Sequence, residues 1–261
     1  MGGRPWVGSG WLVRMNVGWV LECDRDGPEQ ASRFSWPRCS KGWHHHAAHP
    51  AGGPSPVDAP AEEGAATRDQ KCGEITPYYL FHPLVPERIQ RCCPKARLIV
   101  LLRDPVERAL SQLFHSQRFG LELLPLERAL AAEPERLRTA ERALKRRQRH
   151  KSHQEHSYVA RSRYELQLQR YEQLFPRDQL WIGRSEDLFE RPEWVWRELL
   201  QWLELDVIPL PEMGVRANAG TGATGELGDD SRARIRSQLR EQLAPTYASM
   251  EKKYGLVWNA D

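Results

Sequence analysis

One continuous stretch constrains the fold of this chain more than any other. Residues 96–102 read ARLIVLL, an apolar run without the alternation of a half-exposed strand. Runs of this kind are typical of strands that are covered on both faces of a parallel sheet. Arg103, Asp104 and Pro105 follow at once. Asp104 is a favourable helix N-cap, and Pro105 suits the first helical position because its missing N–H costs nothing there. The stretch therefore predicts a buried strand, a tight turn and a helix in direct succession.

The helix after this turn carries one apolar stripe. Its apolar residues recur at helical spacing and are Val106, Ala109, Leu110, Leu113 and Phe114. Such a stripe buries one side of a helix, and we expect it to face the sheet. Ser111 lies off the stripe, about two turns into the helix. Arg108, about one turn in, adds positive potential at the same end.

The remaining sequence divides into two parts. The chain has 261 residues, enough for one sizeable α/β domain. Residues 1–70 are rich in Pro, Gly and Ala and lack an amphipathic period, which predicts an irregular or disordered extension. Residues 71–261 alternate strand and helix patterns, as a parallel sheet requires. Within them, residues 73–81 (GEITPYYLF) form a short β-rich run, and Pro134 is expected to divide a charged helical region.

Composition excludes several classes of protein. The net charge is only +3, so there is no global signal for nucleic-acid binding. The five cysteines contain no metal-binding pair, and no apolar stretch is long enough to span a bilayer. We therefore expect a cytoplasmic protein without a metal, and we interpret the histidines at 44–46 as an unstructured tract. No GxxxxGK[ST] motif is present, which disfavours an NTPase. The basic run at 144–151 (LKRRQRHK) favours a solvated helix face, with a nucleic-acid or glycan surface as the alternative.

The turn at Arg103 carries the clearest chemistry. Ligands of open parallel sheets bind beyond the carboxyl ends of the strands, where Arg103 is expected. A guanidinium offers several donors in a fixed fork that suits a phosphate, and a helix N-terminus adds positive potential. The Ser111 hydroxyl could donate to the same anion. The alternative is that Arg103 pairs with a carboxylate and Ser111 is simply solvated, and the pattern by itself favours neither.

A family resemblance favours the phosphate. The stretch RLIVLLRDPVERALSQLFH resembles the 3′-phosphate-binding element of the cytosolic and heparan-type sulfotransferases. These enzymes transfer a sulfuryl group from 3′-phosphoadenylyl sulfate (PAPS). In that family an arginine at a strand end and a serine eight residues later hold the 3′-phosphate, which implies this role for Arg103 and Ser111. GEITPYYLFHP, the segment from residue 157 onward (SYVARSRYELQLQRYEQLFP) and the terminal YGLVW are also similar to family segments, so the resemblance covers roughly residues 73–258.

The resemblance implies a fold, a reaction and further site residues. The fold is the P-loop-like sulfotransferase fold, an α/β fold with a parallel sheet flanked by helices. PAPS is the co-substrate, no metal is required, and the partner is a small-molecule or glycan acceptor rather than a nucleic acid or a membrane. Glu74 is a candidate catalytic base, with structural ion pairing as its alternative. Four residues are expected to line the acceptor cleft unless ordinary packing explains them: Thr76, Tyr78, Ser157 and Tyr158.

The sequence departs from the family at its N-terminal part. Relatives open with a strand and a Lys-x-Gly-Thr-Thr loop that holds the 5′-phosphosulfate, and no such loop is visible here. Lys41-Gly42 lacks the following Ser or Thr, and the Gly-rich residues 219–228 lie far downstream. We therefore expect an incomplete or irregular N-terminal part. Either the chain binds the nucleotide without turnover, or its first seventy residues are not the natural start of the protein.

Overall fold

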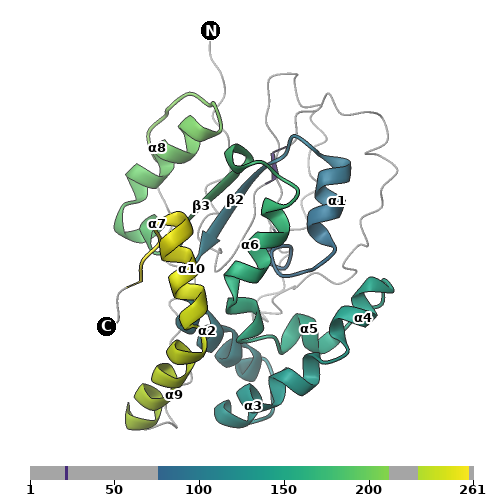
Figure 1. Ribbon diagram of the computed structural model, residues 1–261. Helices are drawn as coiled ribbons and strands as arrows, with labels where there is room; N and C mark the ends of the chain where they lie inside the picture. Colours follow the sequence, from purple (N-terminus) through teal and green to yellow (C-terminus); the bar gives the residue numbers. More distant parts are fainter. Residues whose placement is uncertain (1–20, 23–75, 212–228, 259–261) are drawn as a thin grey trace, which may run out of the picture.

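The apolar run forms the central strand of a three-stranded sheet. In the computed structural model, which describes residues 21–22, 76–211 and 229–258, this strand is β2 (Arg97–Leu102). It pairs in parallel with β3 (Leu180–Arg184), with Leu98 opposite Leu180 and Leu102 opposite Arg184. On its other edge it pairs antiparallel with β1 (Leu21–Glu22), a strand that the sequence pattern of the N-terminal region did not predict. The expected fold class, a parallel sheet flanked by helices, is confirmed (Figure 1).

The two faces of β2 are covered by different helices. Leu98, Val100 and Leu102 belong to one core with residues of α1, α6 and α10, whereas Ile99 and Leu101 belong to another with residues of α7 and α8. Burial of each such side chain contributes about 1.5–3 kcal/mol, so both faces favour apolar residues. This explains the unbroken apolar run. The bounds of these helices are Val85–Cys92 for α1, Tyr164–Glu172 for α6, Asp187–Glu190 for α7, Pro192–Trp202 for α8 and Ala244–Tyr254 for α10.

The helix α2 (Pro105–Arg118) packs away from the sheet. Its stripe is buried as expected, but the partners are residues of α3 (Leu126–Leu137) and α9 (Asp229–Gln242). The expectation that the stripe faces the sheet is therefore wrong. The reason is that α2 begins beyond the last residue of β2 and continues past the carboxyl edge of the sheet, where only helices are available (Figure 1).

The charged helical region is not divided at Pro134. The helix α3 runs through this proline and ends at Leu137, so the expected break is displaced by about one turn. Pro134 is exposed, so water can reach the carbonyl group that loses its hydrogen bond. Two short helices follow, α4 (Ala140–Lys145) and α5 (Lys151–Glu155).

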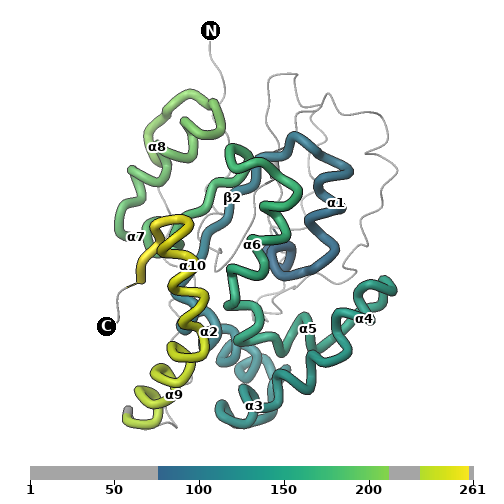
Figure 2. Tube along the Cα trace, viewed as in Figure 1, coloured from purple at the N-terminus to yellow at the C-terminus, as the bar shows by residue number. Residues whose placement is uncertain are grey.

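The described part of the expected β-rich run, residues 76–81, forms turns instead of a strand. The Tyr79 N–H donates to the Thr76 carbonyl (3.0 Å), and the His82 N–H donates to the Tyr78 carbonyl (3.1 Å). Pro77 lacks the N–H that a strand ladder needs, which accounts for this difference. At the other end of the chain, α9 and α10 pass close to α2 and α6, so the C-terminal segment returns to the carboxyl edge of the sheet (Figure 2).

Candidate functional site

The candidate site is built on the turn that joins β2 to α2. Arg103 follows the last strand residue, and Asp104 caps the helix. The Asp104 Oδ1 atom accepts hydrogen bonds from the N–H groups of Val106 and Glu107, each at 2.9 Å. Pro105 is the first residue of α2, so the predicted cap and start are confirmed. The positive end of the α2 dipole therefore lies beside Arg103.

Arg103 is half-buried, and within the described residues its guanidinium makes no hydrogen bond or ion pair. Only its backbone is held, because the carbonyl accepts a hydrogen bond from the Tyr164 hydroxyl at 2.9 Å. Burial raises the pKa of Tyr164 well above its usual range, so this hydroxyl remains a donor. The alternative role for Arg103, an ion pair with a carboxylate, is not observed among these residues. A partly desolvated guanidinium with open donors is suited to an anion from outside the chain.

Ser111 and Arg108 lie further along α2 and differ in their surroundings. Ser111 is half-buried, and its hydroxyl makes no hydrogen bond with a described residue. Arg108 is only 4% exposed. Its Nε donates to Ser162 Oγ (2.6 Å), its Nη1 donates to Gln112 Oε1 (2.7 Å), and its Nη2 donates to the Tyr158 carbonyl. The donors of Arg108 are thus used inside the protein, and only its charge is available to a ligand.

Tyr78 belongs to a cluster of aromatic and basic side chains. Its hydroxyl lies 2.5 Å from His153 Nδ1, and the Arg161 guanidinium lies 5.2 Å from the centre of its ring. Burial lowers the pKa of His153 to about 3, helped by the charge of Arg161. The imidazole is therefore neutral at pH 7, so Nδ1 can accept a hydrogen bond from the Tyr78 hydroxyl. Thr76 lies two residues before Tyr78, in the same turn.

Ser157 and Tyr158 are fully buried. The Ser157 hydroxyl donates to the His153 carbonyl (2.8 Å), and the Tyr158 hydroxyl donates to Glu122 Oε2 (2.9 Å). Burial by itself would raise the pKa of Glu122, but hydrogen bonds from Arg136, the Leu124 N–H and Tyr158 outweigh this effect and lower the pKa to about 2. Both hydroxyl groups are therefore engaged in internal contacts.

Three arginines connect the turn with the Tyr78 cluster. Burial lowers the pKa of Arg108, and the positive charge of Arg103 lowers it further. Burial and the charge of Arg108 likewise lower the pKa of Arg161 to about 9. Arg108 thus interacts electrostatically with both Arg103 and Arg161, and the Glu133 carboxylate partly offsets this positive zone.

Several predicted features lie outside the described residues. These are Glu74, Lys41-Gly42, the histidines at 44–46 and the Gly-rich residues 219–228. Within the part of the chain that the structure describes, no group of three or more His, Cys, Asp or Glu side chains could hold a metal ion. No helix there is long and apolar enough to cross a bilayer. The basic run at 144–151 is mostly exposed, and Lys145 and Lys151 pair with Glu141 and Glu155 on their own helices.

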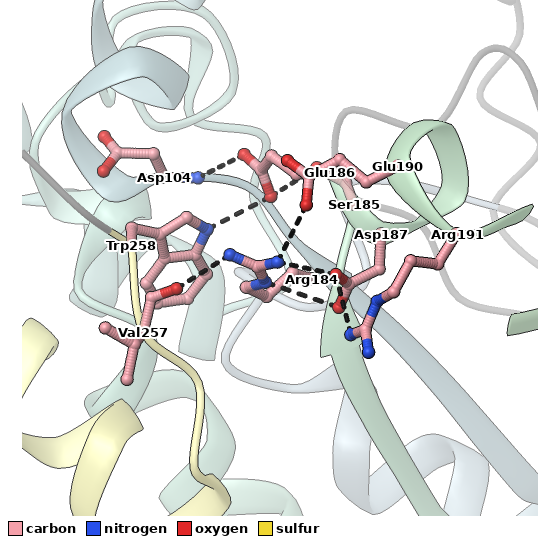
Figure 3. Close-up of polar contacts among 9 residues, drawn as sticks. All are labelled: Asp104, Arg184, Ser185, Glu186, Asp187, Glu190, Arg191, Val257 and Trp258. Carbon is pink, nitrogen blue, oxygen red and sulfur yellow. Dashed lines mark hydrogen bonds and ion pairs between the residues drawn. The ribbon is translucent and has the colours of Figure 1, made fainter. Parts of the chain in front are cut away.

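Sequence reasoning missed the residues that support the turn from other elements. Glu186, just after β3, accepts hydrogen bonds from the Asp104 N–H (2.9 Å) and from the Trp258 indole N–H (3.1 Å), as Figure 3 shows. The Tyr247 hydroxyl donates to Asp104 Oδ2 (2.7 Å). The sequence position of Glu186 could have indicated this role, because it follows a second strand. The carboxyl ends of neighbouring parallel strands meet at one edge of a sheet.

The fold and this turn define an α/β protein in which a strand, a tight turn and a capped helix meet at the carboxyl edge of a parallel sheet. A family model described as "Sulfotransferase domain" matches residues 60–212, and the chain belongs to this family. It is similar to the membrane-associated sulfotransferase kil1 of Dictyostelium discoideum, with 46% identity over 52 residues, which are 20% of this chain and 11% of that protein. It is also similar to a sulfotransferase crystal structure from Alicyclobacillus acidocaldarius, with 26% identity, a TM-score of 0.49, and coverage of 68% of this chain and 62% of that chain.

Proposed function

We propose that this chain binds PAPS and transfers its sulfuryl group to a hydroxyl or amine of a carbohydrate-like or small acceptor. The observation that carries the proposal is the half-buried Arg103 guanidinium, which lacks a hydrogen bond or ion pair among the described residues at the carboxyl end of β2. Membership of the sulfotransferase family supports sulfuryl transfer as the reaction class. A cytoplasmic location is part of the proposal, because the five cysteines are an odd set without a repeating spacing, a pattern that does not predict a disulfide framework.

In this proposal the turn binds the 3′-phosphate. The Arg103 fork and the Ser111 hydroxyl donate to the phosphate oxygens, and the α2 N-terminus adds positive potential. Hydrogen bonds to charged groups contribute about 1.5–3 kcal/mol each, so these donors account for a large share of the nucleotide affinity. The series Arg103, Arg108 and Arg161 extends the positive zone toward the acceptor side.

The transfer step places the acceptor near Tyr78. An acceptor oxygen or nitrogen attacks the sulfur, a new bond to sulfur forms, and the bond between sulfur and the 5′-phosphate oxygen breaks. The electron pair of the broken bond leaves with adenosine 3′,5′-bisphosphate, and the acceptor proton passes to the Glu74 carboxylate. Thr76 and Tyr78 would contact the acceptor, whereas Ser157 and Tyr158 would have to leave their internal hydrogen bonds to do so. We therefore assign the latter two to support of the acceptor side.

Two measurements on the full chain test this function. Isothermal titration calorimetry with adenosine 3′,5′-bisphosphate should show binding that is lost in Arg103→Ala and retained in Arg142→Ala, a matched change of an exposed arginine on α4. A transfer assay with 35S-labelled PAPS and a panel of glycan and small hydroxylated or amine acceptors should show label on at least one acceptor. Absence of nucleotide binding would contradict the proposal.

A second candidate function is binding of the nucleotide without turnover. The absence of a Lys-x-Gly-Thr-Thr loop from the sequence favours it. Each donor to the developing charge in such a site is worth on the order of 3 kcal/mol, so loss of a whole loop would abolish turnover and leave the 3′-phosphate contacts intact. Tight binding of the bisphosphate together with no label on any acceptor would support this candidate over transfer.

A further inference from the structure

We infer that Glu186 and Trp258 are positioning residues, which hold the Arg103 turn in the geometry that binds the 3′-phosphate. This inference rests on the proposed function. It concerns residues from two other parts of the chain, the turn after β3 and the C-terminal segment. Neither residue is proposed to touch the nucleotide, because both act on Arg103 through its backbone.

The peptide group between Arg103 and Asp104 is held by side chains on both of its polar atoms. The Arg103 carbonyl accepts a hydrogen bond from the Tyr164 hydroxyl (2.9 Å), and the Asp104 N–H donates to Glu186 Oε1 (2.9 Å). The strand β2 ends one residue earlier, and α2 begins one residue later. These two contacts therefore fix the orientation of the peptide group next to the Arg103 side chain. The hydrogen bonds of the sheet and of the helix do not reach this peptide group.

Glu186 is itself held by the C-terminal segment. Its Oε2 accepts a hydrogen bond from the indole N–H of Trp258 (3.1 Å), and the Trp258 side chain is buried (Figure 3). The segment is tied down by two further contacts. Arg184 Nη1 donates to the Val257 carbonyl (2.9 Å), and Arg240 Nη2 donates to the Trp258 carbonyl (3.0 Å). These contacts hold the Trp258 indole in place, and its N–H in turn orients the Glu186 carboxylate.

This direction matters because Glu186 could otherwise neutralise Arg103. Its carboxylate bonds the N–H of the residue next to Arg103, yet the structure shows no ion pair between these two side chains. With both oxygen atoms engaged by N–H donors, the carboxylate is held away from the guanidinium. Loss of the indole donor would leave Oε2 with only the Ser185 hydroxyl, at 3.4 Å, and let the carboxylate compete with the phosphate for Arg103.

Charge and position predict opposite effects for a change at Glu186. A carboxylate near the phosphate repels it, so its neutralisation in Glu186→Gln should strengthen binding if charge dominates. If position dominates, binding should weaken, because the Gln amide group can accept from only one donor and presents its own N–H groups to the other. In that case the amide N–H groups face the indole N–H of Trp258, and removal of the indole in Trp258→Phe relieves this conflict.

The experiment measures dissociation constants by calorimetry for two ligands, adenosine 3′,5′-bisphosphate and adenosine 5′-phosphate. We expect Glu186→Gln to weaken bisphosphate binding about 10-fold and Trp258→Phe about 3-fold, since small misplacements of a binding group have effects of this order. The monophosphate, which lacks the 3′-phosphate, should bind every variant within about 2-fold of the unaltered chain. The double variant should bind the bisphosphate better than the product of the two single effects predicts.

Matched controls are available near both positions. Glu193→Gln changes an exposed carboxylate on α8, and Trp194→Phe changes an exposed tryptophan on the same helix. Both should bind the two ligands as the unaltered chain does. A loss of affinity for both ligands in Glu186→Gln would indicate a merely structural role and overturn the inference, as would a gain in affinity for the bisphosphate. If Glu186→Gln does not fold, Trp258→Phe and its ligand preference decide the matter.

Failure of this inference can be told apart from failure of the proposed function. If the unaltered chain does not bind the bisphosphate, or if Arg103→Ala binds it equally well, the proposed function fails. If binding depends on Arg103 but the Glu186 and Trp258 variants behave like their controls, only the positioning role fails.

Discussion

Two arginines five residues apart in the sequence are used in opposite ways. Arg108 belongs to what we name the buried bridge, formed with Gln112, Tyr158 and Ser162, where its donors are bound inside the protein. Arg103 belongs to the edge turn, residues 103–105, where its guanidinium is half-buried and makes no hydrogen bond or ion pair with a described residue. The same side chain therefore supports the fold in one region, and in the other it makes no polar side-chain contact with a described residue; we propose that it serves a ligand there.

The difference shows where stability and binding are separated in this protein. A buried polar group that loses its partner costs about 1–3 kcal/mol, and more when it is charged. Removal of Arg108 leaves such partners behind, whereas removal of Arg103 leaves none among the described residues. We therefore expect changes in the buried bridge to affect folding first and changes in the edge turn to affect binding first. The four predictions below test this separation, from the largest expected effect to the smallest.

Arg108→Met should lower the free energy of unfolding by about 3 kcal/mol, because Ser162, Gln112 and the Tyr158 carbonyl lose their donor. Urea denaturation measures this change. Arg128→Met, a change of an exposed arginine on α3, is the control and should shift stability by less than about 0.5 kcal/mol. Equal stability of the two variants would show that the buried bridge does not support the fold.

Arg103→Ala should weaken adenosine 3′,5′-bisphosphate binding about 100-fold, which corresponds to the loss of a bidentate charged contact. Its unfolding midpoint should match that of the unaltered chain, since no internal partner is lost. Arg103→Lys keeps the charge but not the fork, and an intermediate loss of about 10-fold is expected. A large drop in the midpoint of Arg103→Ala would contradict the contrast with Arg108.

Lowering the pH should destabilise the fold, because two histidines, the half-buried His82 and the buried His153, are neutral in the folded chain. Burial lowers the pKa of His82 to about 4 and that of His153 to about 3, while both titrate near 6.5 in the unfolded chain. Below pH 6.5 the unfolded chain therefore binds protons that the folded chain does not, and the free energy of unfolding decreases as the pH falls. The two pKa shifts at full size would cost about 4 kcal/mol between pH 7 and pH 5, and because solvent screens part of each shift we expect a loss of about 2 kcal/mol.

A variant isolates the contribution of His153 to this effect. His153→Gln keeps an acceptor for the Tyr78 hydroxyl and removes the titrating group. Urea denaturation at pH 7 and pH 5 should show a loss of about half the original size in this variant. Glu122, whose pKa is lowered to about 2, stays ionised in the folded chain over this interval. Burial raises the pKa of Glu133, but this group is present in both proteins, so the difference between them reports on His153. An unchanged pH dependence would show that His153 does not titrate as described.

Ser111→Ala should have the smallest effect, a weakening of bisphosphate binding of about 10-fold, the lower end of the value of one hydrogen bond to a charged group, because the site is half-exposed. Calorimetry measures it against Ser237→Ala, a matched change at an exposed position of α9. Stability should be unchanged in both, since neither hydroxyl makes a hydrogen bond with a described residue. No difference between the two variants would remove Ser111 from the proposed site.

The parts of the fold that depend on local pattern were predictable. The apolar run, the Asp104 cap and the Pro105 start gave the strand, turn and helix, because each depends on a few adjacent residues. Two local predictions were wrong. The helix continues through Pro134 because this proline is exposed, and residues 76–81 form turns because Pro77 cannot donate to a strand ladder. The support of the turn by Glu186 and Trp258 depends on contacts across 82 and 72 residues of sequence, which local patterns do not contain.

The position of β2 has a consequence for how the edge turn can move. β2 pairs with β3 from Leu98 to Leu102, and these residues are buried on both faces. The amide hydrogens of such a strand exchange with solvent mainly through global unfolding. Arg103 is the next residue along the chain, so we expect the start of the edge turn to open as rarely as this strand does. We therefore expect the edge turn to adjoin a part of the sheet that opens only when the whole fold opens.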